Sequence, residues 1–286
     1  MVSDWRHIPN GRHRDETPEP LPYDDLKPSS LMLGHTLLGS GSSQVVVMHE
    51  WLGDSSNYDA LHPYLDTTAH RFCLADLRGY GRSMAQAGAH TLDEACQDIL
   101  ALADALEAPR FHLIGHSMSA LIAQRIAWLA SDRVRSLVAI TPVFAAGFPA
   151  DDAARAQLLA VATDDDAARA AIAARTGHRH TRPWLDFKLN KSRQRSTEEA
   201  RIGYLQMFTG TDFQRDVQGW PTPLLVLHGE HDIPVYREEA LRRTFGACYP
   251  NLRLEQVANA GHYPMLETPV FLASRINAFL AEQEAS

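Results

Sequence analysis

The chain has 286 residues, of which 45% are hydrophobic and 22% are charged, as in an ordinary globular protein with a large core. Its 27 basic and 35 acidic residues give a formal net charge of −8. This acidic balance argues against a nucleic-acid partner and against binding to an anionic lipid surface.

Residues 1–30 contain five prolines and many charges, and we expect them to form an irregular N-terminal arm. Residues 1–10 lack the apolar run of a secretion signal. No run of about 18 apolar residues is present that could span a bilayer. We therefore expect a cytoplasmic protein that has no membrane partner.

From about residue 31 the chain alternates β-rich runs with helical patterns. The predicted strands are Gln44–Met48, Arg71–Asp76, Arg110–Gly115, Val134–Ile140, Pro223–His228 and Leu252–Val257. The predicted helices cover 92–107, 118–130, 236–246 and 267–283. Near-continuous apolar strands that alternate with helices indicate an α/β fold, with a mostly parallel twisted sheet covered by helices on both faces.

The alternation of strands and helices stops between residues 143 and 219. This stretch is far longer than an ordinary connection in a compact domain, and its own patterns are helical. We predict that 143–219 forms a helical cap, inserted into a core made of 31–142 and 220–286.

A serine stands between the predicted strand 110–115 and the predicted helix 118–130, in the string GHSMS at 115–119. A tight strand-to-helix turn projects the serine hydroxyl clear of the sheet. Such a turn needs small residues two positions away on each side, because strand and helix pass close together there. We predict that Ser117 is a nucleophile; an ordinary serine N-cap is the alternative.

A carboxylate and a histidine follow the last two predicted strands. Asp232 stands just after the strand 223–228, on the rim where the serine is expected, and would orient a histidine. Glu230 and His231 are alternatives that we interpret as turn or surface residues. Among the 14 histidines, His262 is singled out by its glycine-containing loop and by the chain order Ser, Asp, His. We predict that His262 is a general base.

These three residues in this order, the DLRGYGRS turn at 76–83 and the HEWLG segment at 49–53 resemble the α/β-hydrolase superfamily. The similarity runs from about residue 30 to the end of the chain. It implies a triad of Ser117, Asp232 and His262. It also implies an oxyanion hole formed by the backbone N–H groups of Trp51 and Met118, and it implies no cofactor.

The resemblance implies an enzyme that hydrolyses a carboxylic ester, a lactone or a related acyl substrate through an acyl-enzyme intermediate. Acyl transfer, C–C bond hydrolysis and cofactor-free oxygenation of heteroaromatic rings are alternatives on the same fold. In the last of these, His262 is the working base and Ser117 is not a nucleophile. A ligand-binding protein that has kept the fold is a further alternative, against which the presence of all three triad residue types argues.

Two positions depart from the family pattern. Ser119 stands where a second glycine is usual, and serine is small enough to keep the close packing. Glu50 also replaces a glycine, and a carboxylate beside the oxyanion hole would repel a developing negative charge. We expect Glu50 to turn outward or to pair with Arg78 or Arg82. The alternative is contact with the substrate or with His262.

Several residues are candidates for the wall of a substrate pocket, although aromatic residues at helical spacing are more often part of a core. The candidates are His49, Glu50, His116, Phe144, Trp184, Tyr204 and Phe208. They predict an apolar or aromatic small-molecule acyl substrate. We expect no metal site, because His178 and His180 lack a third ligand at suitable spacing. Exposed cap surface leaves a homodimer open.

Overall fold

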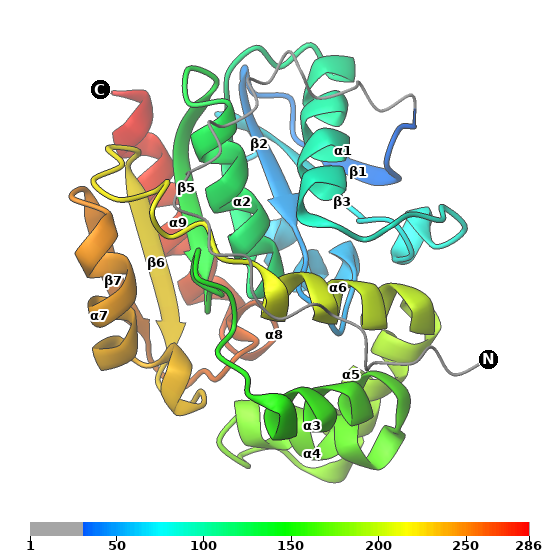
Figure 1. Cartoon of the computed structure of the whole chain (residues 1–286). Helices are drawn as coiled ribbons and strands as arrows, with labels where there is room; N and C mark the ends of the chain where they lie inside the picture. The colour runs from blue at the N-terminus through cyan, green and yellow to red at the C-terminus, as the bar shows by residue number, and fades with distance from the viewer. Residues whose placement is uncertain (1–30, 286) are drawn as a thin grey trace, which may run out of the picture.

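The computed structural model describes residues 31–285, so the predicted arm at 1–30 lies outside the described residues. In this part of the chain, seven strands form one sheet in the order β1-β3-β2-β4-β5-β6-β7 (Figure 1). The strands are β1 (His35–Leu38), β2 (Ser43–Met48), β3 (His70–Ala75), β4 (Phe111–His116), β5 (Val134–Ile140), β6 (Leu224–Gly229) and β7 (Leu252–Val257).

All neighbouring strands from β3 to β7 in this order are parallel, and β1 alone pairs antiparallel, with β3. The predicted mostly parallel sheet is therefore confirmed, and the six predicted strands agree with the structure to within one residue at each end. The strand β1 was not predicted. This edge strand has four residues that are mostly half-buried, too few for a recognisable alternation.

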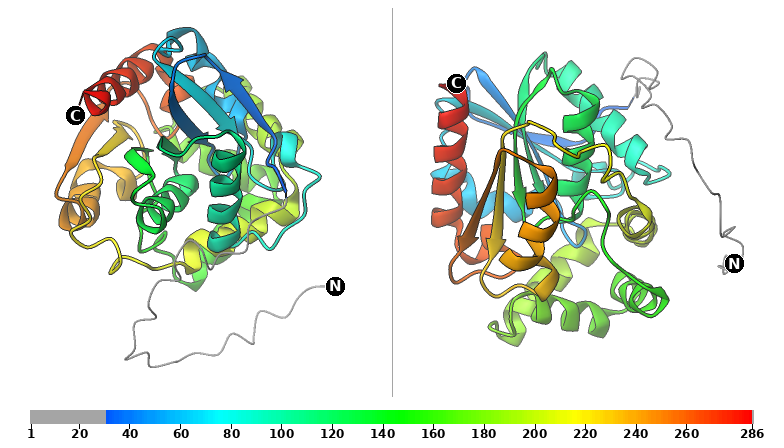
Figure 2. Two further views of the ribbon diagram at one scale, coloured as in Figure 1. Left: turned by 90° about the horizontal axis from the view of Figure 1, so that it is seen from above. Right: turned by 60° about the vertical axis from the view of Figure 1, so that its left-hand side comes forward.

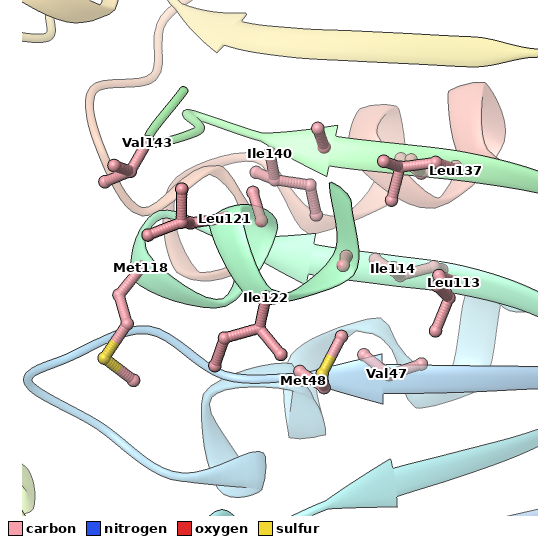
Figure 3. Close-up of a cluster of buried hydrophobic side chains, with 14 of the residues drawn as sticks. Val47, Met48, Leu113, Ile114, Met118, Leu121, Ile122, Leu137, Ile140 and Val143 are labelled. Carbon is pink, nitrogen blue, oxygen red and sulfur yellow. The ribbon is translucent and has the colours of Figure 1, made fainter. Parts of the chain in front are cut away.

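Helices cover both faces of the sheet. The helices outside 143–219 are α1 (Leu92–Ala105), α2 (Met118–Leu129), α7 (Glu238–Cys248), α8 (Pro264–Glu267) and α9 (Pro269–Glu284), with 3-10 turns η2 (Ser55–Tyr64), η3 (Gly81–Ser83) and η4 (Pro234–Tyr236). The right-hand view of Figure 2 shows α9 on one face and α2 and α7 on the other. Buried side chains such as Val47, Ile114 and Ile122 fill the layer between α2 and the sheet (Figure 3).

Four further helices lie between β5 and β6: α3 (Asp152–Thr163), α4 (Asp165–Arg175), α5 (Arg182–Arg195) and α6 (Glu198–Gly210). Asp151 and Asp164 begin α3 and α4 as N-caps, because their carboxylates accept hydrogen bonds from the backbone three residues on. In Figure 1, α3, α4 and α5 gather beyond the carboxyl ends of the parallel strands. None of the helices within 31–285 is long and apolar enough to cross a bilayer.

Candidate active site

Ser117 forms the sharp turn between β4 and α2. Its backbone has φ 54° and ψ −113°, a left-handed conformation that is strained for any residue with a Cβ. Neighbouring strands hold it there: its N–H donates to the carbonyl of Ile140 at 2.9 Å, and its carbonyl accepts from the N–H of Val143 at 3.0 Å. Gly115 permits the close approach, since a Cβ there would lie 2.7 Å from the Cα of Ala120.

His262 lies between the serine and a carboxylate. Its Nε2 is 3.0 Å from Ser117 Oγ, and its Nδ1 is 2.6 Å from Asp232 Oδ2. The second carboxylate oxygen accepts from the N–H of Ile233 at 2.7 Å. An ionised carboxylate can only accept, so Nδ1 carries the ring proton and Nε2 presents its lone pair to the serine hydroxyl. The structure thus brings Ser117, Asp232 and His262 into one hydrogen-bonded line.

The loop that carries His262 is held from two sides. Glu267 Oε1 accepts from the N–H groups of Gly261 and Tyr263, at 2.9 and 3.1 Å. From the other side, the N–H of His262 donates to the carbonyl of Arg175 at 2.8 Å. A Cβ at position 261 would lie 2.4 Å from that carbonyl oxygen, so only glycine fits. The last residue of α4 therefore helps to position the imidazole.

The backbone N–H groups of Trp51 and Met118 donate to no acceptor within residues 31–285. Met118 is the first residue of α2, where N–H groups are free and the helix dipole favours negative charge. In Figure 3, Met118 lies near the loop that follows β2 and carries Trp51. The Trp51 ring is anchored by its Nε1, which donates to the carbonyl of Arg201 in α6 at 2.7 Å.

Glu50 is fully buried beside this loop and is paired with a buried lysine. Its Oε1 lies 2.7 Å from Lys188 Nζ in α5 and 3.2 Å from Asn57 Nδ2. Its Oε2 accepts from the N–H of Leu52 at 2.5 Å. Burial alone would raise the pKa of this carboxyl, but Lys188, His116 and the hydrogen bond from Leu52 outweigh it and lower the pKa to about 2.

Comparison with known proteins identifies the family. A family model described as the alpha/beta hydrolase fold matches residues 44–269. The chain belongs to the α/β-hydrolase family. The predicted resemblance is thereby confirmed for most of the chain.

Known relatives of the chain differ in how much of it they match. The pimeloyl-[acyl-carrier protein] methyl ester esterase of Serratia marcescens is 26% identical over 256 residues, which cover 85% of this chain and 96% of the esterase. The dihydrolipoyllysine-residue acetyltransferase component of the acetoin cleaving system of Pseudomonas putida is 34% identical over 123 residues, or 43% of this chain. The chain aligns with only 33% of that acetyltransferase.

Among solved structures, the bromoperoxidase from Bacillus anthracis superposes with a TM-score of 0.76 at 19% identity, covering 86% of this chain and 94% of the peroxidase. At this identity the likeness is one of fold. The ester-hydrolysing relative and the family match agree with the predicted α/β-fold hydrolase.

The glutamate that departs from the α/β-hydrolase pattern lies differently from our expectation. Glu50 does not turn outward, and neither predicted arginine is its partner. Arg78 instead forms a two-pronged ion pair with Asp98, at 2.5 and 2.7 Å, and the Arg82 side chain donates to the Thr36 hydroxyl. The expected partners were wrong because Arg78 and Arg82 are bonded to other residues, whereas Lys188 of α5 lies against Glu50.

Two predicted pocket histidines are engaged by the backbone around the site. His49 Nδ1 donates to the carbonyl of Glu50 at 2.8 Å, while its Nε2 accepts from the N–H of Leu77 at 3.1 Å. His116 Nε2 donates to the carbonyl of His262 at 2.7 Å. Both rings are buried, so the structure places them as supports of the loops that bear Glu50 and His262.

The four predicted aromatic residues all pack against other rings. The pairs are Phe144 with Phe245 at 5.0 Å, Phe208 with Trp51 at 5.4 Å, Trp184 with His180 at 4.2 Å, and Tyr204 with Tyr80 at 5.7 Å and His90 at 5.1 Å. Phe208 therefore touches the residue predicted for the oxyanion hole, and Trp184 also lies 6.0 Å from the Tyr263 ring. Tyr204 packs with Tyr80 and His90, and this cluster also contacts the loop after β2, because the Tyr80 hydroxyl donates to the carbonyl of Trp51 at 2.9 Å.

Two tyrosines that we did not predict flank the histidine. The Tyr236 ring lies 4.7 Å from the His262 ring, and the Tyr263 ring lies 5.4 Å from it. Burial raises the pKa of Tyr236 to about 12, although Arg175 and a hydrogen bond to Ser117 act in the opposite direction. Tyr263 adjoins His262 in sequence, and Tyr236 follows Asp232 by four positions. This nearness to the predicted triad residues is the only feature of the sequence that could have indicated the two tyrosines.

The pH dependence of stability should report the buried His116. Burial, assisted by neighbouring His262, lowers the pKa of His116 from 6.5 to about 3. Below pH 6.5 the unfolded chain therefore binds a proton at His116 that the folded chain does not bind. The free energy of unfolding is unaffected by this residue above pH 6.5 and decreases as the pH falls below it. We expect a loss of about 1.4 kcal/mol per pH unit from this residue below that value.

Urea unfolding between pH 6.5 and 4.5 measures this effect, because Glu50, with its lowered pKa, begins to contribute only below its ordinary value of 4.5. The His116→Gln variant should show a slope smaller by about that amount, 1.4 kcal/mol per pH unit. His90, His112 and His228 also have lowered pKa values and remain in both proteins. Equal slopes for variant and wild type would contradict the assignment.

Proposed function

We propose that the chain is a serine hydrolase of small-molecule carboxylic esters. The observation that carries this proposal is the line from Asp232 Oδ2 through His262 to Ser117 Oγ, with separations of 2.6 and 3.0 Å, at a serine held with φ 54°. A strained serine with a neutral histidine as acceptor and an orienting carboxylate is the arrangement that acyl transfer requires. The esterase relative that aligns over 85% of the chain supports the ester as substrate.

In the proposed reaction, Ser117 Oγ attacks the ester carbonyl carbon while His262 Nε2 takes the hydroxyl proton. Asp232 stabilises the imidazolium that forms, and the N–H groups of Trp51 and Met118 donate to the oxyanion. Collapse of the tetrahedral intermediate breaks the bond to the alcohol oxygen, which receives the proton from His262. Water then attacks the acyl-enzyme with His262 again as base, and the carboxylic acid leaves.

The four helices within 143–219 would serve as a cap that selects the substrate. They reach the site at three points, the carbonyls of Arg175 and Arg201 and the ammonium of Lys188. The remaining described residues, 31–142 and 220–285, would then supply the core that carries the triad. Substrate preference should accordingly respond to changes in these helices more than to changes in the sheet.

Burst kinetics with p-nitrophenyl butyrate test the proposal. Wild type should release p-nitrophenol in an initial burst equal to the enzyme concentration, and a fluorophosphonate probe should label Ser117. The Ser117→Ala variant should show neither, whereas Ser274→Ala, which changes a serine on α9, should keep both. Fluorophosphonate labelling and turnover that persist in Ser117→Ala would rule out this nucleophile.

A further inference from the structure

A buried arginine near the proposed nucleophile has no acidic partner. Arg175, the last residue of α4, is 6% exposed, yet its guanidinium forms no ion pair with a carboxylate of residues 31–285. The buried hydroxyl of neighbouring Tyr263 has no hydrogen-bond partner among residues 31–285 either, and a guanidinium has five N–H donors that need acceptors. Arg201 shows the contrast: it is 5% exposed and donates to the carbonyls of Ala162 and Ser196.

The surroundings of Arg175 place this residue beside the proposed base. Its carbonyl accepts from the N–H of His262 at 2.8 Å, so its backbone lies against the loop of the base. Its guanidinium interacts electrostatically with Tyr236, Tyr263, Asp232 and Glu50. The Tyr236 ring in turn lies 4.7 Å from the His262 ring. The Arg175 backbone and the Tyr236 ring therefore both lie against the proposed base.

The other charged groups of the site already have partners. Asp232 pairs with His262 at 2.6 Å, and Glu50 pairs with Lys188 at 2.7 Å. Burial acts to lower the pKa of Arg175, but the tyrosines and the two carboxylates outweigh it, so the guanidinium stays charged. A buried cation without an anion is costly, and a guanidinium binds a carboxylate through two parallel hydrogen bonds. An anion on a ligand would satisfy Arg175 without competing for a group of the triad.

We propose that Arg175 binds a carboxylate on the substrate, so that the enzyme prefers half-esters of short dicarboxylic acids over neutral esters. This inference rests on the proposed ester hydrolysis and adds the substrate class. The second carboxylate would lie only a few bonds from the scissile ester, because Arg175 contacts the backbone of His262, whose ring is 3.0 Å from Ser117 Oγ. Arg175 is then the residue that sets specificity, while Ser117 and His262 perform the chemistry.

Binding to the Ser117→Ala variant tests the carboxylate site without turnover. Isothermal titration calorimetry at neutral pH compares monomethyl succinate and monomethyl glutarate with their neutral dimethyl esters. We expect the half-esters to bind about 10- to 100-fold more tightly, as charge-assisted bidentate hydrogen bonds imply. Adding Arg175→Gln should abolish the preference, and Arg175→Lys should keep part of it. Arg182→Gln, which removes an exposed cationic side chain of α5, should leave it intact.

Equal affinity for half-ester and diester, no binding of either half-ester, or a preference that survives Arg175→Gln would overturn the inference. The first comparison uses the native Arg175, so it holds even if a substitution impairs folding. Hydrolysis by the wild type separates the two proposals. If half-esters bind tightly but are not cleaved, ester hydrolysis fails and the carboxylate site stands. If both ester types are cleaved equally well, hydrolysis stands and the carboxylate site fails.

Discussion

Ester hydrolysis by the Ser117→Ala variant is expected to fall by about four to six orders of magnitude in kcat, since nucleophile, base and orienting acid act as one unit. Alanine keeps the Cβ of serine, so the strained backbone at φ 54° is unchanged and the fold should be as stable as before. For the same reason His262→Ala should cost a similar factor, and the double variant should be little worse than either single variant.

Steady-state kinetics on p-nitrophenyl esters, with the melting temperature as a check of folding, measure this loss. The pair of variants also separates ester hydrolysis from ring oxygenation with His262 as base. If the enzyme instead oxygenates a heteroaromatic ring with His262 as base, the Ser117→Ala variant retains activity while the His262→Ala variant loses it. Comparable losses in both variants, with unchanged melting temperatures, are the result that nucleophilic catalysis requires.

The parts of the fold and site that were predictable are those determined by local sequence. The apolar strand 110–115, the small residues at 115 and 119 and the following helical pattern together indicate a strand-to-helix turn at Ser117. The structure has that turn, with Gly115 against α2 and the Ser119 hydroxyl donating to the carbonyl of Met48 at 2.9 Å. Asp232 and His262 were identified by their places just after strands, because parallel strands end at one rim.

Contacts between the helices of 143–219 and the core were not predictable. Glu50 and Lys188 are 138 positions apart, and their pairing depends on how α5 lies on the loop after β2. Lys188 stands in an ordinary helical pattern of charged and apolar residues, which does not distinguish a buried lysine from a solvated one. The burial of Arg175 was equally unpredictable, because a cationic residue at a helix C-terminus is most simply explained by the helix dipole.

The Glu50–Lys188 pair gives the largest expected change in stability. Lys188→Met should reduce the free energy of unfolding by about 3–5 kcal/mol, because it leaves a carboxylate buried without its cation. Asn57 and the N–H of Leu52 would remain as donors, but both side chains of the pair are fully buried, so neither donor supplies the charge that is lost. The double variant Glu50→Gln/Lys188→Met should recover much of this loss, since it removes both buried charges.

A nearby lysine and the pH dependence make this test specific. Lys191, three residues further along α5, donates to the carbonyl of Ser56 and has no carboxylate partner among residues 31–285, so Lys191→Met should cost far less stability.

With Lys188 present, the pKa of Glu50 is about 2, so the stabilisation that Glu50 provides is complete above pH 4.5 and lost as the pH falls towards 2. Without Lys188, burial dominates and raises that pKa, so the sign reverses and acid should partly restore Lys188→Met. Urea unfolding of the two methionine variants at neutral and mildly acidic pH measures both effects. Equal costs for the two variants would mean that the buried pair contributes nothing specific to stability.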